Sequence, residues 1–476
     1  MKKIVALLLA FCLSFSALGV MADPLPAGSL FTEAQLIEGV GKNITTYGVY
    51  GDYSNGNAYL QTLVKLVEAH PELYTEIMKS LLSSVDKYGA YFTPAESAKL
   101  LESLSDTITG IGVSVTQIGD ALIISQVLPN TPAERAGLKS GDRIISANGT
   151  ALSGMDLDKA TSYIKGPAGT TVSVVVRRDG AGEITFNIVR ETIVSEPVHS
   201  EIIDNKIGYI EIFSFSTNTA KYVNSALGDF RRARVKNIII DVRNNSGGYL
   251  NEAIEVADLF LPKKAVITSE DRKGTKNDIK YVATGPSEDY NIVVLMNNYS
   301  ASASEVLAAA LSENKAAILI GERSYGKGTV QTMSRLMDGG IIKYTTAFYL
   351  TPSGKNIEGI GLMPDVFVEN TTKKVDLSQF KEPSYKKTFS VGQSSEEIKN
   401  VKEMLAFLGV YQGEINEYFD ENMALAVSLV QKASGYLPQN GILDPATQIE
   451  LLQILSEAEI EVDDQLEMAK QYFYVR

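Results

Sequence analysis

The spacing of apolar residues changes from one part of the chain to the next, and this change limits how the chain can fold. Between Leu30 and Leu101 apolar residues recur at helical spacing. From about Thr107 to Arg190, short β-rich runs alternate with Gly, Asp and Asn turns. From Lys206 to Val368, apolar strands alternate with helical segments, as in an α/β core. A polar stretch, 369–395, leads into a final helical segment. The 476 residues are too many for one hydrophobic core of usual size, so we expect several joined domains.

The first 22 residues differ in composition from the rest of the chain. Lys2 and Lys3 precede an apolar run from Ile4 to Leu18, and small residues stand before a cleavage point between Ala22 and Asp23. This arrangement is typical of a secretory signal peptide. An uncleaved membrane anchor is the alternative, but the run is shorter than the ~20 residues that a spanning helix needs. We therefore predict an exported protein, located in the cell envelope or secreted.

Cysteine and histidine are scarce, which excludes several kinds of catalysis. Cys12 is the only cysteine and lies in the leader, so the mature chain has no thiol for catalysis, disulfides or metal binding. The two histidines are His70 and His199. A Ser-His-Asp triad would have to use His199, which stands in a Pro-Val-His-Ser connection and is better explained as a solvated loop residue. We expect no metal and no cofactor. The net charge of −13 argues against binding to nucleic acid.

A cluster of three serines follows a buried strand and begins a helix of small residues. The cluster contains Ser300, Ser302 and Ser304. A hydroxyl at the first turn of a helix, beside free backbone N–H groups, is suited to nucleophilic attack and to stabilising an oxyanion. The alternative is that these serines only cap the helix. The pattern alone leaves both readings open.

A lysine between two glycines supplies a candidate base. Lys327 lies between Gly326 and Gly328, after an apolar strand. Lysine acts as a base near neutral pH only if burial or a nearby charge lowers its pKa from about 10.4. Ser-Lys pairs are a known form of nucleophile activation, and the lysine would replace the missing histidine. Gln331 could orient its amine. A phosphate-binding loop is the alternative, but the Walker spacing is not present.

A second glycine turn, Asp241–Gly248, ends an apolar strand. Its backbone N–H groups could line an oxyanion hole, although Asn/Gly turns after strands are common. Together with Tyr349–Gly354 and the Ser and Lys motifs, this turn resembles the C-terminal processing (tail-specific) peptidases. The resemblance runs from about Leu30 to Val368.

The resemblance implies a role for each matching residue. Ser302 matches the nucleophile, Lys327 the base and Gln331 the residue that supports the lysine. The N–H groups of Gly248 and Ala303 would donate to the oxyanion. Gly247 is a close rival for this role, and Glu313 matches an acidic position to which we assign no catalytic role.

The β-rich module resembles a PDZ domain of the bacterial, circularly permuted kind. Four consecutive residues match its carboxylate-binding loop, where a substrate's C-terminal end would add as a strand: Gly110, Ile111, Gly112 and Val113. Pro129–Asp142 and Ile144–Gly149 are also similar to segments of that family. Lys165 stands where some relatives have an arginine that links peptide capture to activation. Lysine cannot make a bidentate contact, which leaves that link open.

The final helical segment resembles a peptidoglycan-binding domain, through Val401–Ile415 and Gly441–Thr447. Asn416 and Glu417 stand where relatives commonly have Asp-Gly. On the strength of the resemblance, affinity for the cell wall is our hypothesis. Because of the departure at Asn416 and Glu417, a purely structural or dimer-forming role is the alternative.

We predict a multidomain α/β and α+β protein, with a PDZ β-rich module inserted before an α/β peptidase core and a small helical C-terminal domain. The predicted parts are a signal peptide (1–22), a helical N-terminal region (23–104), a PDZ domain (105–192), the peptidase core (193–370), a linker (371–395), a peptidoglycan-binding-like domain (396–456) and an acidic tail (457–476).

The predicted function is that of an exported serine endopeptidase. It would recognise protein C-terminal tails through the PDZ domain and cleave peptide bonds through an acyl-enzyme. Its expected partners are substrates with free C-termini, peptidoglycan and a second copy of the chain in a homodimer. The alternatives are a catalytically inactive PDZ scaffold anchored to the cell wall and a wall-active hydrolase.

Overall fold

The computed structural model describes residues 37–40, 42, 56–103, 107–178, 181–194, 196–272, 279–285 and 287–474. The predicted signal peptide and Cys12 lie outside these ranges. Within them, no helix combines the length and apolar character that a membrane span requires. The chain divides into two compact units, each made from separate segments. The core unit contains Met1–Asp106, Glu196–Glu369 and Asp464–Arg476, and the inserted unit contains Thr107–Ser195 and Asn370–Asp463.

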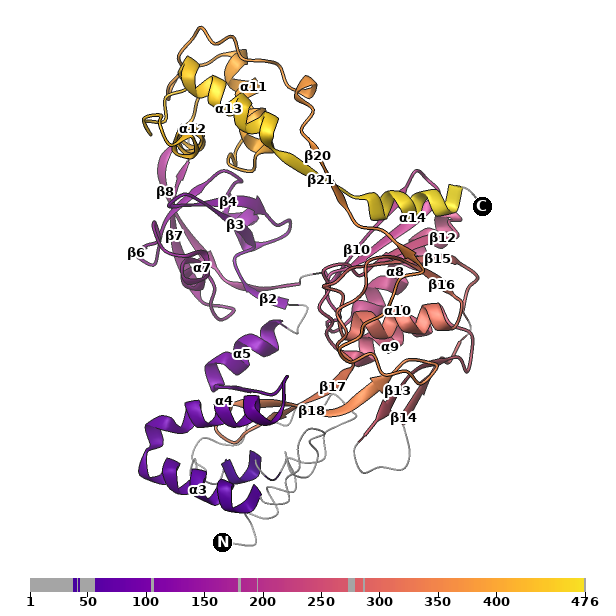
Figure 1. Ribbon diagram of the computed structural model, residues 1–476. Helices are drawn as coiled ribbons and strands as arrows, with labels where there is room; N and C mark the ends of the chain where they lie inside the picture. The colour runs from indigo at the N-terminus through magenta and orange to yellow at the C-terminus, as the bar shows by residue number, and fades with distance from the viewer. Residues whose placement is uncertain are drawn as a thin grey trace. The chain divides into compact units, whose positions relative to one another are not determined.

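A six-stranded sheet forms the centre of the core unit (Figure 1). The first two strands are antiparallel and the others are parallel. Its central strands are almost entirely buried and apolar, as expected for a parallel sheet that is covered on both faces. In sheet order the strands are β10 (Val198–Ile203), β11 (Ile207–Ile212), β12 (Asn237–Asp241), β15 (Asn291–Met296), β16 (Ala317–Gly321) and β19 (Val366–Phe367).

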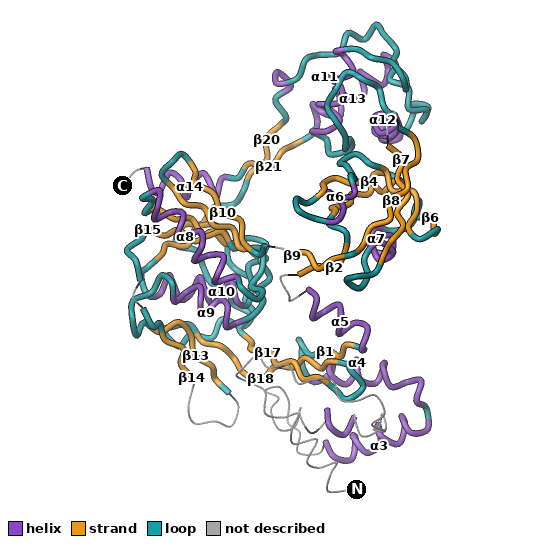
Figure 2. Tube along the Cα trace, turned by 180° about the vertical axis from the view of Figure 1, so that it is seen from behind, coloured by secondary structure: helices purple, strands orange, loops and turns teal. Residues whose placement is uncertain are grey.

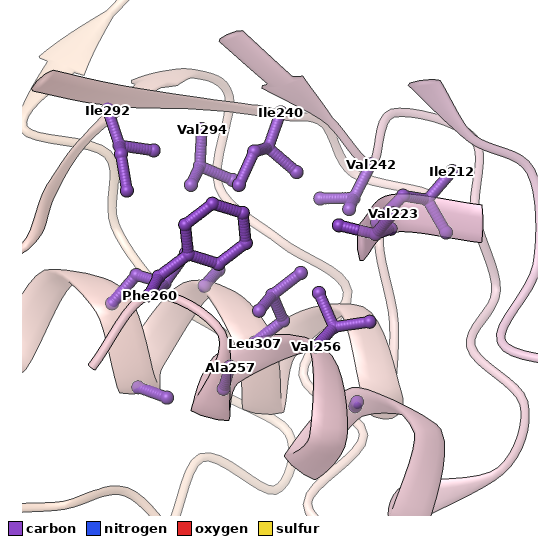
Figure 3. Close-up of a cluster of buried hydrophobic side chains, with 14 of the residues drawn as sticks. Ile212, Val223, Ile240, Val242, Val256, Ala257, Phe260, Ile292, Val294 and Leu307 are labelled. Carbon is purple, nitrogen blue, oxygen red and sulfur yellow. The ribbon is translucent and has the colours of Figure 1, made fainter. Parts of the chain in front are cut away.

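Helices cover both faces of this sheet, and successive residues of its strands point to opposite sides. On one face, α8 (Thr219–Ala233), α9 (Leu250–Asp258) and α10 (Ala303–Glu313) pack against Ile240 and Val294 (Figure 3). On the other face lies α14 (Asp464–Tyr474), whose Ala469 packs in a buried cluster with Ile239, Val293 and Leu295. The segment expected from sequence to be an acidic tail thus contains a helix that forms a third layer of the core unit.

A second sheet in the core unit places the N-terminal helical region beside the lysine loop. Its longest strand, β18, pairs with β1, β13 and β17. The helix α4 packs on this sheet through Met78 and Leu82, next to Ile342 and Tyr344. The elements are α3 (Gly56–Ala69), α4 (Tyr74–Val85), β1 (Ala90–Phe92), α5 (Pro94–Ser103), β13 (Val266–Asp271), β14 (Ile279–Val282), β17 (Thr329–Arg335) and β18 (Ile341–Leu350).

The inserted unit contains a β-rich part and a helical part, each with its own buried cluster (Figure 2). The β-rich part is a sheet in the order β3-β4-β5-β7-β8, with β6 on β5. Its elements are β3 (Val113–Ile118), β4 (Ala121–Val127), α6 (Pro132–Ala136), β5 (Arg143–Ala147), β6 (Thr150–Ala151), α7 (Leu157–Ile164), β7 (Thr171–Arg178) and β8 (Gly182–Val189). The helical part consists of α11 (Glu396–Phe407), α12 (Glu421–Ser434) and α13 (Pro445–Glu457).

Each part of the inserted unit is bounded by a two-stranded antiparallel ribbon. The first ribbon pairs β2 (Thr107–Gly110) with β9 (Glu191–Val194). The second pairs β20 (Thr371–Lys374) with β21 (Glu459–Val462). Because each ribbon brings the two ends of a part together, both parts are insertions in the chain of the core unit.

Candidate active site

A sharp turn presents Ser302 at the start of α10. Ser302 is the N-cap of this helix and has a φ of 57°, an uncommon value for a residue with a side chain. Such a backbone costs on the order of 1–3 kcal/mol and persists only where its surroundings hold it. Gly247 lies against it so closely that an added Cβ would be 2.8 Å from the Ser302 Cβ. The Ser302 side chain remains partly exposed.

The two neighbouring serines have a different environment. Ser300 and Ser304 are almost fully buried. The Ser300 hydroxyl donates to the carbonyl oxygen of Val242 (2.8 Å), and the Ser304 hydroxyl donates to that of Asn245 (2.9 Å). These two hydroxyls hold the turn in place, and Ser302 is the partly exposed serine of the three.

The glycine turn after β12 is joined to the turn that contains Ser302 through Asn245. The carbonyl oxygen of Asn245 accepts a hydrogen bond from the N–H of Ala301 (3.0 Å). Its side-chain oxygen accepts one from the N–H of Gly247 (2.8 Å). Gly248 has a φ of 145°, and a Cβ there would lie 2.2 Å from the carbonyl oxygen of Phe215. Glycine is therefore required at 247 by the approach of the Ser302 turn, and at 248 by the approach of the Phe215 backbone.

A buried carboxylate fixes the turn that contains Ser302 to the loop that contains Lys327. Glu305 is fully buried, and its side chain accepts hydrogen bonds from the N–H groups of Ser302 (2.9 Å), Gly326 (2.7 Å) and Lys327 (2.8 Å). The Tyr349 hydroxyl lies 3.2 Å from the carbonyl oxygen of Ser302 and 2.5 Å from that of Lys327. Burial raises the pKa of Tyr349, so this hydroxyl stays protonated. Glu305 and Tyr349 thus both bind the backbone of the Ser302 turn and the backbone of the Lys327 loop.

The side chain of Lys327 has an amide partner. Its Nζ donates to the Gln331 side-chain oxygen (3.0 Å), and the Gln331 side-chain nitrogen donates to the carbonyl oxygen of Tyr88 (2.8 Å). Burial, and then the positive charge of Lys343, lower the pKa of Lys327. Among the described residues, no carboxylate forms an ion pair with Lys327. These conditions favour the neutral amine that a general base requires.

An open pocket of about 600 Å³ adjoins these groups. Ala301, the residue before Ser302, and Lys327 both belong to its wall. Three tyrosines provide aromatic surface in the pocket beside polar side chains, and such surface suits an apolar side chain of a peptide. The residues that line it are Tyr88, Asn244, Ser246, Tyr299, Ala301, Tyr325 and Lys327.

The sequence indicated no role for Glu305, Tyr349 or Tyr88, although Tyr349 begins one of the motifs that carry the resemblance. Glu305 stands three residues after Ser302, a spacing that indicates a capping box. That signal could have identified its bond to the Ser302 N–H, but not those to Gly326 and Lys327, which depend on the tertiary fold.

Other candidate residues lie in structural contacts. His199 is exposed, but the prediction of a loop was wrong, because the residue lies on the edge strand β10 and is paired with β11. His70 is exposed beside Glu72. Glu313 accepts hydrogen bonds from the backbone and hydroxyl of Ser353, which explains an acidic residue there without a catalytic role. In the described part of the chain, no three His, Cys, Asp or Glu side chains gather as a metal site would require.

The four residues Gly110–Val113 join β2 to β3 in the inserted unit. Gly112 has a φ of 90°, and a Cβ there would overlap the Thr131 side chain at 2.2 Å. The loop is further held by a hydrogen bond from the Ala133 N–H to the Ile111 carbonyl oxygen (2.8 Å). Lys165 follows α7 directly, whereas the buried guanidinium of Arg190 binds the carbonyl oxygen of Ile164 (2.7 Å).

Three family models match the chain. Peptidase family S41 matches residues 206–368, a PDZ domain 123–178 and a putative peptidoglycan binding domain 394–451. Over 401 residues the chain is 35% identical to the carboxy-terminal processing protease CtpA of Bacillus subtilis strain 168, covering 82% of this chain and 83% of that protein. The chain belongs to peptidase family S41. This S41 member is a C-terminal processing serine peptidase with a PDZ domain and a peptidoglycan-binding domain, so the predicted family, fold class and enzyme class are confirmed.

Two further proteins that are similar to the chain are also named as proteases. A probable CtpA-like serine protease of Staphylococcus aureus strain MRSA252 is 33% identical over 388 residues, covering 80% of this chain and 76% of that protein. Among solved structures, the photosystem II D1 C-terminal processing protease is 28% identical, with a TM-score of 0.46, and the match covers 71% of this chain and 94% of that one.

Proposed function

We propose that this S41 peptidase cleaves peptide bonds through a Ser302–Lys327 dyad. The observation that carries the proposal is the clamp formed by Glu305 and Tyr349, which holds the backbones of both residues. The same region leaves Lys327 with an amide partner and a lowered pKa. The buried hydrogen bonds of Ser300 and Ser304 favour Ser302 as the nucleophile.

Acylation starts from the neutral amine of Lys327. As the Ser302 oxygen forms a bond to the carbonyl carbon of the substrate, its proton passes to the lysine Nζ. The N–H groups of Gly248 and Ala303 donate to the resulting oxyanion. Gly247 is the weaker candidate because its N–H already donates to Asn245. The lysine then protonates the departing amine as the C–N bond breaks, leaving an acyl ester on Ser302.

Water completes the cycle. Lys327 accepts a proton from the water that attacks the ester carbonyl, and returns it to the Ser302 oxygen as the C–O ester bond breaks. Gln331 accepts one N–H of the lysine, so the lone pair of the neutral amine is left for the proton transfer.

The substrates we propose are proteins with free C-termini. The turn Gly110–Val113, where the chain runs into β3, is the proposed site for the terminal carboxylate, with the substrate tail as an added strand. The peptidoglycan-binding domain and the CtpA relatives indicate an envelope-associated location. We further propose that residues 1–22 direct export, that the C-terminal helical domain binds peptidoglycan, and that the protein forms a homodimer.

Substitution of each dyad member tests the mechanism. We expect Ser302→Ala and Lys327→Ala to abolish cleavage of an unfolded protein while binding of a fluorescent tail peptide, measured by anisotropy, is retained. Lys355→Ala removes an exposed lysine and is the control that keeps activity. Cleavage at the wild-type rate by either dyad variant would contradict the proposal.

Two further comparisons separate the alternatives. A peptide with a C-terminal amide should bind more weakly than the same peptide with a free carboxylate, and equal affinity would exclude the proposed carboxylate site. Incubation with purified peptidoglycan should release no muropeptides, whereas their release without cleavage of protein would indicate a wall-active hydrolase. Cleavage of neither material would indicate an inactive scaffold.

A further inference from the structure

The turn between α4 and β1 contacts the proposed base site, although it belongs to the N-terminal helical region. Tyr88 in this turn precedes Gln331 by 243 positions. Its sequence, Asp86-Lys87-Tyr88-Gly89, contains no motif that indicates chemistry. The side chain and the backbone of Tyr88 nevertheless both reach groups that surround Lys327.

Tyr88 makes three contacts there. Its carbonyl oxygen accepts the hydrogen bond from the Gln331 side chain (2.8 Å), the amide that also holds Lys327. The centre of its ring lies 5.3 Å from the Lys327 Nζ. Its hydroxyl donates to Glu358 (2.8 Å), which also accepts from the N–H of Gly328, next to the lysine (2.8 Å). Tyr88 thus contacts Lys327 and Gln331 directly, and it is linked to the lysine loop through Glu358.

The turn itself is rigidly held. The buried carboxylate of Asp86 accepts hydrogen bonds from the N–H of Tyr88 (2.9 Å), and from the N–H and the hydroxyl of Thr345 on β18. At Gly89, an added Cβ would lie 2.9 Å from the Asp86 Cβ and from the carbonyl oxygen of Leu82. The position of Tyr88 is therefore fixed to the same sheet that follows the lysine loop.

We propose that Tyr88 is a positioning residue for the base: its ring keeps water from the Lys327 amine, and its carbonyl oxygen sets the orientation of Gln331. This inference rests on the proposed role of Lys327. It adds a residue from the N-terminal helical region to the catalytic machinery of the core unit.

The expected direction of the effect follows from the groups around the lysine. An aromatic ring attracts an ammonium, but it also displaces the water that would stabilise the charge. Burial is the largest influence on the pKa of Lys327, so loss of the ring should raise this pKa. The charged groups that act on Lys327 are Asp86 in the turn, Glu305 on α10, Lys343 on β18 and Glu358 after β18. Substitution of Tyr88 changes none of these four residues, and Tyr88→Phe removes only the hydroxyl that binds Glu358.

The test is the pH dependence of two reactions, peptide cleavage and labelling of Ser302 by a small fluorophosphonate. For Tyr88→Ala we expect the acid limb of both profiles to move to higher pH, with a roughly 10- to 100-fold lower kcat near neutral pH. Tyr88→Phe keeps the ring and the backbone and should stay within a few-fold of the wild type. Tyr299→Ala removes another aromatic ring from the pocket wall and should leave the acid limb in place.

Each outcome decides the proposal. An unchanged acid limb and kcat in a folded Tyr88→Ala protein would overturn it, and so would an equal shift in Tyr299→Ala. If Tyr88→Ala fails to fold, Tyr88→Leu replaces it, and the same shift, of smaller size, is required. Activity that survives in Lys327→Ala would instead refute the dyad, whatever the Tyr88 variants do.

Discussion

Lys402 and Lys327 are both withdrawn from solvent, the first fully and the second partly, and their surroundings differ in one essential respect. Lys402 on α11 is fully buried and forms an ion pair with Asp420, with further hydrogen bonds to Asn416 (3.0 Å) and to the carbonyl oxygen of Glu414 (3.3 Å). Lys327 is only partly buried, and its Nζ donates to the amide oxygen of Gln331. Burial alone therefore does not make a base. A carboxylate partner stabilises the charged form of a lysine, whereas an amide partner does so much less.

The largest effect should come from removing Lys327, which forms no ion pair with a carboxylate in the described part of the chain. We expect Lys327→Met to lower kcat by about 10²- to 10⁴-fold or more, the range of a positioned general base. The free energy of unfolding should stay the same or rise slightly, because no ion pair is broken. Steady-state kinetics and urea unfolding measure both quantities. A large loss of stability would make Lys327 a structural residue like Lys402.

The opposite result is expected for the paired lysine. Lys402→Met leaves Asp420 buried without its partner, which should destabilise the C-terminal helical domain by about 3–5 kcal/mol. Cleavage of a short peptide by the folded enzyme should change little. Thermal unfolding measures the loss, and the double variant Lys402→Met/Asp420→Leu should recover part of it. If the single variant is as stable as the wild type, the ion pair contributes nothing and the contrast between the lysines fails.

A smaller effect concerns the charge that acts on Lys327. Lys343 on β18 lowers the pKa of Lys327, because two positive charges repel each other. Lys343→Met should therefore raise that pKa and move the acid limb of kcat/KM to higher pH, lowering activity several-fold near neutrality. Lys343→Arg keeps the charge and is the matched control. A shift toward lower pH in the Met variant would show that another influence dominates.

The smallest effect is expected from a buried polar side chain that contacts neither lysine. Gln465 on α14 accepts a hydrogen bond from Arg243 (3.2 Å) and donates to the carbonyl oxygen of Val368 (2.9 Å). Arg243 binds Asp241, where the glycine turn begins. We expect Gln465→Ala to lower stability by about 1–2 kcal/mol and kcat by only a few-fold. A loss of kcat as large as that of Lys327→Met would place α14 in the catalytic machinery.

The sequence indicated the local motifs from which the proposed site is built. Ser302, Lys327 and Gln331 lie in short motifs beside glycines, and the scarcity of histidine and cysteine favoured lysine as the base. Which serine of the three is the nucleophile depended on resemblance, because a pattern of small hydroxyl residues does not show which side chain is buried. The structure distinguishes them by the buried hydrogen bonds of Ser300 and Ser304.

The contacts between distant segments were not predictable in this way. Glu305 follows Ser302 closely, but its bonds to the lysine loop exist only after the strands have assembled. Tyr88 lies in a turn without any chemical motif. The segment that contains α14 is acidic and short, and its packing on the sheet depends on the apolar face of Leu466 and Ala469 rather than on the overall composition. Contacts between residues that are far apart in sequence cannot be predicted from the local patterns of a single sequence.

The two ribbons that bound the inserted unit have a consequence for the order of synthesis. The helix α14, which covers the second face of the central sheet, follows both insertions in the chain. During translation, the face that contains Ile239, Val293 and Leu295 has no cover until the PDZ and peptidoglycan-binding domains have been made. Closure of this face joins segments that are far apart in sequence, which makes it a late folding step. The core unit therefore completes the second face of its sheet only after both inserted parts have been made.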